Sequence, residues 1–175
     1  MRYFKILLFI LCFLGGSGVF GYADINRGTP SKFMRHEHDQ LHARIERLAK
    51  APGKTGEVAK KLLMVMRPHM FNEEEFVLPE LGVLKKLAFG ESMAGMTWVI
   101  GASEKLKEKY PQMLVEHKAI LLAVDELKQA AELEGDQTAL DLAAHLKAHI
   151  QDEEDVIYPA AILAGQYIKK NYSKG

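Results

Sequence analysis

The sequence is almost without cysteine and has no excess of either charge. Its one cysteine, Cys12, lies in an apolar N-terminal segment, so the rest of the chain can form no disulfide and no thiolate metal site. The 23 basic residues balance the 23 acidic ones, which argues against a nucleic-acid partner, because such proteins normally carry a basic surface. No useful length of chain alternates apolar and polar residues, so no β-sheet is expected.

Residues 1–23 have the composition of a secretory signal peptide. Arg2 and Lys5 precede an apolar run, and a small-x-small cleavage sequence ends at Ala23. The run of roughly 15 residues is shorter than the ~20 that a membrane-spanning helix needs. We therefore expect cleavage near Ala23, a secreted or periplasmic location, and no stable membrane span afterwards. Cleavage removes two basic and no acidic residues, which leaves a net charge of about −2.

The remaining chain has helical periodicity with short interruptions. We expect a linker over 24–29, one all-α domain over 30–165, and a polar tail over 166–175. The helices are expected at 30–50, 55–84, 104–133 and 138–164, with an insert at 85–103. Four helices of this length predict an up-down-up-down four-helix bundle, built from two helical hairpins on either side of the insert.

Polar residues interrupt the apolar line that should face the core of this bundle. In the last helix, steps of three and four residues place Leu142, Leu146, Val156 and Ala160 on the inward line. Along the four helices, six positions on the inward lines are occupied by His38, His69, Glu73, His117, His149 and Glu153. Every predicted helix therefore brings at least one histidine to the core.

These polar positions form a repeat. The pattern His-x-x-x-Glu-Glu starts at His69 and again at His149, and a proline follows each histidine ten residues later. His38 precedes His69 by 31 residues, and His117 precedes His149 by 32. Residues i and i+4 share a face of a helix, so each hairpin supplies one histidine and one His-x-x-x-Glu pair to a common centre.

A metal site accounts for this cluster better than a structural network does. Burying two unpartnered carboxylates costs several kcal/mol each, and protonated histidines would offset only part of that cost. Imidazole and carboxylate are natural ligands of iron, manganese, zinc and copper, whereas calcium and magnesium sites would not use four histidines. We predict two ions, each with two histidines, and glutamates that bridge them.

The motifs EHDQLH, HMFNEEEFVLPEL, EHKAI and HIQDEEDVIYPA, in this order, resemble the hemerythrin-like (HHE cation-binding) domain. The resemblance covers about residues 30–165 and implies a non-haem di-iron centre in a four-helix bundle. It implies that Glu73 and Glu153 bridge the irons, with four histidine ligands: His38, His69, His117 and His149. Members of the family bind dioxygen reversibly, sense oxygen or iron, or handle iron and reactive oxygen or nitrogen species.

The chain departs from the oxygen carriers of this family, which have a fifth histidine on the third helix. Met113 and Leu121 stand where that histidine would lie. His42 or His145 could supply a fifth imidazole, or each could instead hydrogen-bond a ligand at the edge of the site. Glu154 is an alternative to Glu153 as the second carboxylate, although helix geometry favours Glu153.

The function expected from the sequence is a di-iron protein that binds dioxygen, nitric oxide or peroxide for sensing, storage or delivery outside the cytoplasm. A redox enzyme that reduces peroxide and a protein that scavenges iron or zinc are the alternatives. The sequence has no second motif for a substrate or cofactor, which favours a binding protein over an enzyme. Zinc or manganese could replace iron, and the sequence does not identify a redox partner.

Overall fold

Helices form nearly all of the chain that the structure describes. The computed structural model describes residues 31–172, and no strand occurs among them, which confirms the predicted all-helical class. The elements are α1 (Lys32–Leu48), α2 (Gly53–Phe76), α3 (Leu78–Leu81), α4 (Leu84–Ala88), α5 (Trp98–Glu134), α6 (Gln137–Asp152), the π-helix η1 (Glu153–Ile157) and α7 (Tyr158–Tyr172). The predicted signal peptide and linker, 1–29, lie outside the described residues.

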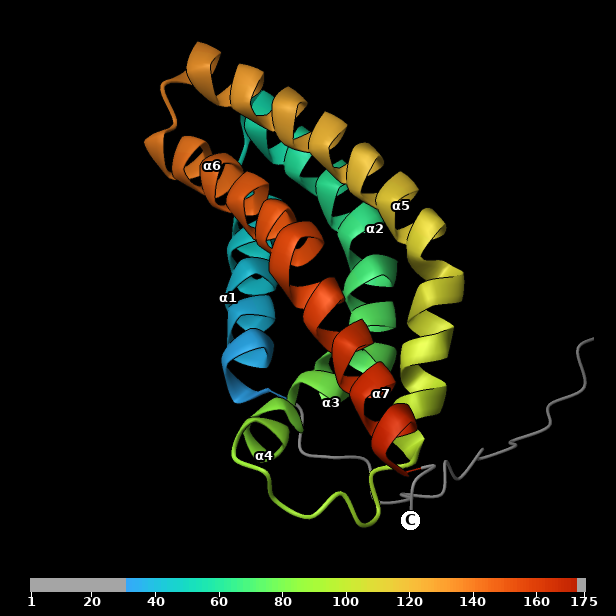
Figure 1. Cartoon of the computed structure of the whole chain (residues 1–175). Coiled ribbons are helices and arrows are strands. Elements are labelled where there is room, and N and C mark those ends of the chain that lie inside the picture. The colour runs from blue at the N-terminus through green and yellow to red at the C-terminus, as the bar shows by residue number, and fades with distance from the viewer. Residues whose placement is uncertain (1–30, 173–175) are drawn as a thin grey trace, which may run out of the picture.

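Four long helical stretches pack side by side: α1, α2, α5 and the continuous run from α6 through η1 to α7 (Figure 1). α5 contacts α2, α6 and α7, and α1 contacts α2 and α6. The largest apolar cluster fills the space between them and includes Leu41, Ile45, Leu62, Ile120, Leu127, Leu142 and Leu146. Short helices α3 and α4 lie at one end of the long ones (Figure 1). None of the helices between residues 31 and 172 is both long and apolar enough to cross a membrane.

The helix bounds differ from the predicted ones on both sides of the predicted insert. α2 ends at Phe76 instead of continuing to residue 84, because Pro79 lacks the N–H that the next helical turn requires. α5 begins at Trp98 instead of residue 104, because Met96 and Val99 are buried in an apolar cluster with Ile168. The same contact keeps α7 helical to Tyr172, within the segment predicted as a tail.

The last predicted helix contains a π turn where the sequence pattern predicted regular α-helix. The N–H of Tyr158 donates to the carbonyl of Glu153, five residues earlier, and Pro159 follows immediately. The extra residue moves the inward line, so Tyr158 and Ala161 are fully buried. Val156 was predicted to face the core and is 58% exposed, and Ala160 is only partly buried, so that part of the prediction is wrong.

Short helix α3 carries a buried acidic side chain away from the histidines. Glu80 is fully buried, and neither of its carboxylate oxygens has a hydrogen-bond partner among the described residues. Burial raises the pKa of Glu80 to about 9, since a carboxylate anion is poorly solvated there. Glu80 is therefore protonated at neutral pH.

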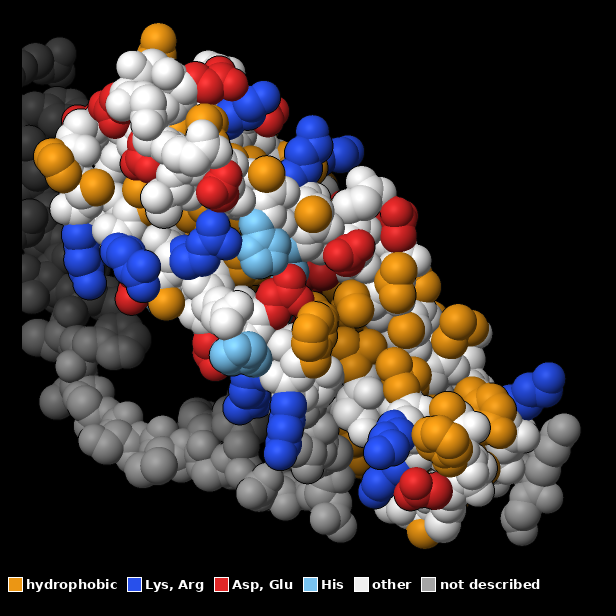
Figure 2. Space-filling model, turned by 90° about the vertical axis from the view of Figure 1, so that its left-hand side faces the viewer, with side chains coloured by type: hydrophobic (Ala, Val, Ile, Leu, Met, Phe, Trp, Pro, Cys, Tyr) orange, Lys and Arg blue, Asp and Glu red, His pale blue; other side chains and the backbone are white. Residues whose placement is uncertain are grey.

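The face that carries α1 and α6 is of mixed charge. Figure 2 shows basic and acidic side chains interspersed over much of this face, with histidines among them and hydrophobic side chains gathered toward its lower end. The partly exposed His145 lies between Arg44 and Glu37 on this side. Interspersed charges of both signs give this face no strong field for steering a charged ligand.

Candidate metal centre

The structure brings the six predicted ligand side chains together inside the molecule. His38 comes from α1, His117 from α5 and His149 from α6, while α2 provides both His69 and Glu73. Glu153 is the first residue of η1. Each of the six is at most 3% exposed.

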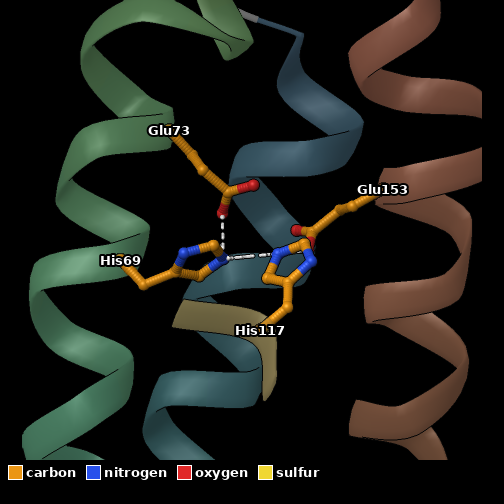
Figure 3. A group of neighbouring side chains, drawn as sticks. All are labelled: His69, Glu73, His117 and Glu153. Carbon is orange, nitrogen blue, oxygen red and sulfur yellow. Dashed lines mark hydrogen bonds and ion pairs between the residues drawn. The ribbon is translucent and has the colours of Figure 1, made fainter. Parts of the chain in front are cut away.

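One group of ligand atoms lies between α2, α5 and the start of η1. The Nε2 atoms of His69 and His117 are 3.1 Å apart. Nε2 of His117 lies 3.3 Å from Oε2 of Glu153, and Nε2 of His69 lies 3.4 Å from Oε2 of Glu73. Figure 3 shows these four side chains directed toward one another from three helices. Four atoms this close could hold one cation.

The second group lies between α1 and α6 and shares Glu153 with the first. Nε2 of His149 is 2.7 Å from Oε1 of Glu153, and Nε2 of His38 is 3.6 Å from the same oxygen. Each group offers ligand atoms that lie within 4.8 Å of one another. Glu153 therefore presents one oxygen to each group, as a carboxylate that bridges two cations would.

Three of the four histidines are oriented by carboxylates outside the groups. In each pair Nδ1 of the histidine faces the carboxylate and Nε2 faces the centre; the pairs are His69 with Glu116 at 3.2 Å, His117 with Glu154 at 2.7 Å, and His149 with Glu37 at 3.4 Å. A carboxylate only accepts hydrogen bonds, so Nδ1 carries the proton and Nε2 directs a lone pair inward. Histidines that bind metals are typically held in this way.

The atoms that face inward lack ordinary partners. The lone pairs of His69 and His117 repel across 3.1 Å unless a proton or a cation lies between them. Among the described residues, Oε2 of Glu73, both carboxylate oxygens of Glu153 and both ring nitrogens of His38 have no hydrogen-bond partner. Buried polar atoms are rarely left without partners, so the donor set fits a cation that would satisfy them together.

Without a metal, protons provide the compensating charge. Burial lowers the pKa of His69, but the nearby carboxylates of Glu153 and Glu73 outweigh it and raise the pKa to about 9. Burial and the neighbouring Glu153 raise the pKa of Glu73 to about 7. Burial also disfavours the Glu153 anion, yet the histidine nitrogens close to its oxygens hold its pKa well below the ordinary value. A metal that binds here must therefore displace protons.

Comparison with protein families identifies the family to which the chain belongs. The family model for the hemerythrin HHE cation-binding domain matches residues 29–161. The chain belongs to the hemerythrin HHE family. A search of the curated proteins and a search of the solved structures each found no match. Membership of a cation-binding family and a buried histidine–glutamate cluster agree with each other, and both support metal binding.

In this hemerythrin-like centre the three additional candidate residues lie outside both groups of ligand atoms. Glu154 accepts a hydrogen bond from Nδ1 of His117. His145 interacts with Arg44 and Glu37. His42 is about one-third exposed and lies near Glu46. His42 and His145 belong to neither group of ligand atoms.

Tyr158, which was not among the residues predicted from the sequence, contacts the hemerythrin-like centre directly. Its hydroxyl donates to Oε1 of Glu73 at 2.6 Å and lies 3.1 Å from Nε2 of His117. Its ring stacks on the His117 ring, with centroids 5.6 Å apart. Burial and the charges of Glu73 and Glu153 raise the pKa of the hydroxyl above its ordinary value, so it keeps its proton. Only knowledge of the π turn would have placed this residue on the inward face.

Proposed function

We propose that this protein binds two iron ions and, through them, a small oxygen or nitrogen ligand. His69 and His117 would hold one ion, and His38 and His149 the other. Glu153 would bridge them, and Glu73 would contribute from the same region. The observation that carries this proposal is the orientation of Glu153: one of its carboxylate oxygens faces His117 and the other faces His149. We also propose that the four long helical stretches form an up-down-up-down bundle of two related hairpins.

The donor set and the family together favour iron. Imidazole and carboxylate ligands suit iron, zinc, manganese and copper, and the described site contains no thiolate. Iron, when bound, supplies exchangeable coordination positions and a change of oxidation state. The residues of this chain supply orientation through Glu37, Glu116 and Glu154, and the surrounding apolar cluster excludes water.

The number of protein ligands leaves room for a further small molecule. Two histidines and shared carboxylates give each ion fewer than the six ligands that octahedral coordination requires. A pocket of about 270 Å³ opens beside His38, with His42, Arg67 and Glu74 in its wall. This pocket offers a short approach from the surface to the His38 side of the centre.

Dioxygen, nitric oxide and peroxide are small enough for such a site. We propose that the protein binds one of them for sensing, storage or delivery, and that it does so outside the cytoplasm. The location rests on the composition of residues 1–23. Reduction of peroxide is the second candidate, favoured by the hydroxyl of Tyr158 beside the ligand atoms, because such a donor can stabilise developing negative charge.

An optical spectrum of the iron-loaded protein separates these functions. Ferrous protein is prepared without oxygen, its iron content is measured, and spectra are recorded as oxygen is admitted and removed. We expect two irons per chain and a charge-transfer band that appears and disappears reversibly. Irreversible bleaching with turnover of peroxide would support the enzyme instead. Colourless protein that keeps zinc and resists exchange with iron would support scavenging.

A matched pair of variants on α1 tests the assignment of the ligands. His38→Ala removes a buried histidine of the centre, whereas His36→Ala removes an exposed histidine that contacts Gln40. We expect His38→Ala to lose at least one iron and His36→Ala to keep both. Two irons per chain in both variants would contradict the assignment.

A further inference from the structure

The two halves of the centre differ at one position that the sequence repeat aligns. When the stretch from His69 is aligned with the stretch from His149, Pro79 aligns with Pro159, and Leu78 with Tyr158. Both side chains are buried. Only the Tyr158 side chain carries a polar atom. The same position of the sequence repeat therefore has a hydroxyl group in the second copy and an aliphatic group in the first.

That hydroxyl makes the two buried glutamates unequal. Oε1 of Glu73 accepts the 2.6 Å hydrogen bond from Tyr158, which leaves Oε2 to face the histidines. Oε2 of Glu73 lies 3.5 Å from Nε2 of His38 and 3.4 Å from Nε2 of His69. Glu153 has no such hydroxyl, and both of its oxygens face histidine nitrogens.

We propose that Tyr158 is a positioning residue: its hydroxyl has one proton, which Oε1 of Glu73 accepts, and this restricts Glu73 to coordination through Oε2. The inference rests on the proposed binding of metal. It goes beyond it by assigning different roles to the two carboxylates, because only Glu73 has an oxygen that a hydroxyl holds back from coordination.

The position of the hydroxyl supports this positioning role. Two adjacent ligands of an octahedral ion with bonds of about 2.1 Å lie about 3 Å apart. The hydroxyl oxygen lies 3.1 Å from Nε2 of His117, and that nitrogen lies 3.1 Å from Nε2 of His69. The hydroxyl therefore stands at the edge of the ligand group, where it keeps Oε1 of Glu73 in a hydrogen bond and away from a coordination position.

Removal of this hydroxyl tests the proposal, with azide as the anionic probe. Tyr158→Phe keeps the ring that stacks on His117 and removes only the donor. Tyr110→Phe is the matched control, because Tyr110 contacts the Tyr158 ring edge-on, with centroids 5.9 Å apart. Diferric protein is titrated with azide, and the charge-transfer band and the dissociation constant are measured together with the iron content.

We expect Tyr158→Phe to keep two irons, to bind azide about tenfold more weakly or worse, and to show a shifted charge-transfer band. Without the hydroxyl, Oε1 of Glu73 is free to coordinate, and azide must compete with it for the position. Tyr110→Phe should stay within about twofold of the unchanged protein. Azide affinity and a spectrum unchanged in Tyr158→Phe would overturn the proposal and make Tyr158 an ordinary core residue.

Further outcomes keep the inference separate from the proposed function. A phenolate-to-iron band in the unchanged protein that disappears in Tyr158→Phe would show direct coordination and overturn a positioning role. Infrared carboxylate bands of the iron-loaded, unchanged protein give a test that does not require a variant. We expect Glu73 and Glu153 to show two distinct coordination modes. One mode shared by both glutamates would overturn the proposal. Failure of the unchanged protein to bind iron would instead refute the proposed function.

Discussion

At the scale of single residues, carboxylates outside the centre orient the imidazole rings of its histidines. Glu37 on α1 faces Nδ1 of His149, and Glu116 on α5 faces Nδ1 of His69. Each glutamate directly precedes a histidine of the centre in the sequence, and each orients a histidine from the other half of the chain. The repeated Glu-His pairs signalled an equivalence, but only the folded chain shows which histidine each glutamate serves.

The hydrogen bond between Glu154 and His117 should matter for metal affinity. Glu154→Gln replaces the anionic acceptor by an amide and lowers the basicity of the inward nitrogen of His117. We expect affinity for the metal to fall by about 10- to 100-fold, the usual effect of losing such a partner. Competition with a chelator of known affinity measures the change.

Glu74→Gln provides the control, because the sequence repeat aligns Glu74 with Glu154. Glu74 lies in the wall of the pocket beside His38, whose Nδ1 has no hydrogen-bond partner among the described residues. We expect this change to leave metal affinity within about twofold. Equal losses in the two variants would mean that surface charge, and not the hydrogen bond to His117, sets the affinity.

At the scale of helices, the π turn at η1 determines which residues of α7 reach the centre. Five residues from Glu153 to Tyr158 complete the turn, where an α-helix would use about four. The turn precedes Pro159, which cannot donate the hydrogen bond that a regular helix requires there. Such turns often accompany functional sites.

The sequence pattern predicted the inward positions correctly only as far as this turn. His149 and Glu153 are buried as expected, because steps of three and four residues hold throughout α6. After Glu153 the pattern predicted Val156, while the structure buries Tyr158. A π turn depends on packing against neighbouring helices, and periodicity within one helix has no information about those neighbours.

Changes of length within the turn test its role. Inserting one alanine after Val156 would place Tyr158 six residues after Glu153, about 240° around an α-helix, and would turn the buried face of α7 outward. Exposure of several apolar side chains at about 1.5–3 kcal/mol each should unfold the protein or abolish metal binding. Circular dichroism melting and metal content measure both effects.

Deleting Val156 should have a milder effect, because Tyr158 then lies four residues after Glu153, on the same face of an α-helix. Pro159 would lie within that helix, at a cost of about 3 kcal/mol. Pro159→Ala in the deletion variant should recover most of this loss, whereas it should not rescue the insertion variant. Rescue of the insertion, or no rescue of the deletion, would contradict the assigned role of the turn.

At the scale of the whole molecule, buried ionisable groups make stability depend on pH and on metal. The folded state raises the pKa of Glu73 to about 7, of Glu80 to about 9 and of His69 to about 9. A carboxyl group whose pKa is raised in the folded state stabilises the fold at low pH. That contribution is lost as pH rises from the pKa of the unfolded state through the pKa of the folded state. A histidine with a raised pKa does the same, so all three groups act in one direction between pH 6 and pH 9.

We therefore expect the metal-free protein to become less stable from pH 6 to pH 9, by up to about 1.4 kcal/mol per pH unit for each group that titrates. Metal binding opposes this trend at the centre, because its ligands must be deprotonated. The rise in melting temperature caused by metal should grow with pH, and calorimetry at each pH measures it. Removal of the metal by a chelator should restore the metal-free curve.

Glu80→Gln separates the contribution of the centre from that of α3. The amide cannot ionise, so the metal-free variant should lose less stability toward pH 9, while its response to metal stays unchanged. The depressed pKa of Glu153 acts only at acidic pH, where its stabilising contribution is lost as pH falls, and does not interfere in this range. An unchanged pH slope in Glu80→Gln would show that Glu80 is solvated in solution.

The two histidine pairs share one side chain, Glu153, and this links the occupancy of one half to that of the other. In the proposed two-ion centre, an ion held by either pair would fix the rotamer of Glu153, which belongs to both groups. The second ion then meets a carboxylate that is already ordered, so the entropy of ordering it is lost only once. Loading should consequently be cooperative, with chains that hold a single ion scarce at every stage of a titration.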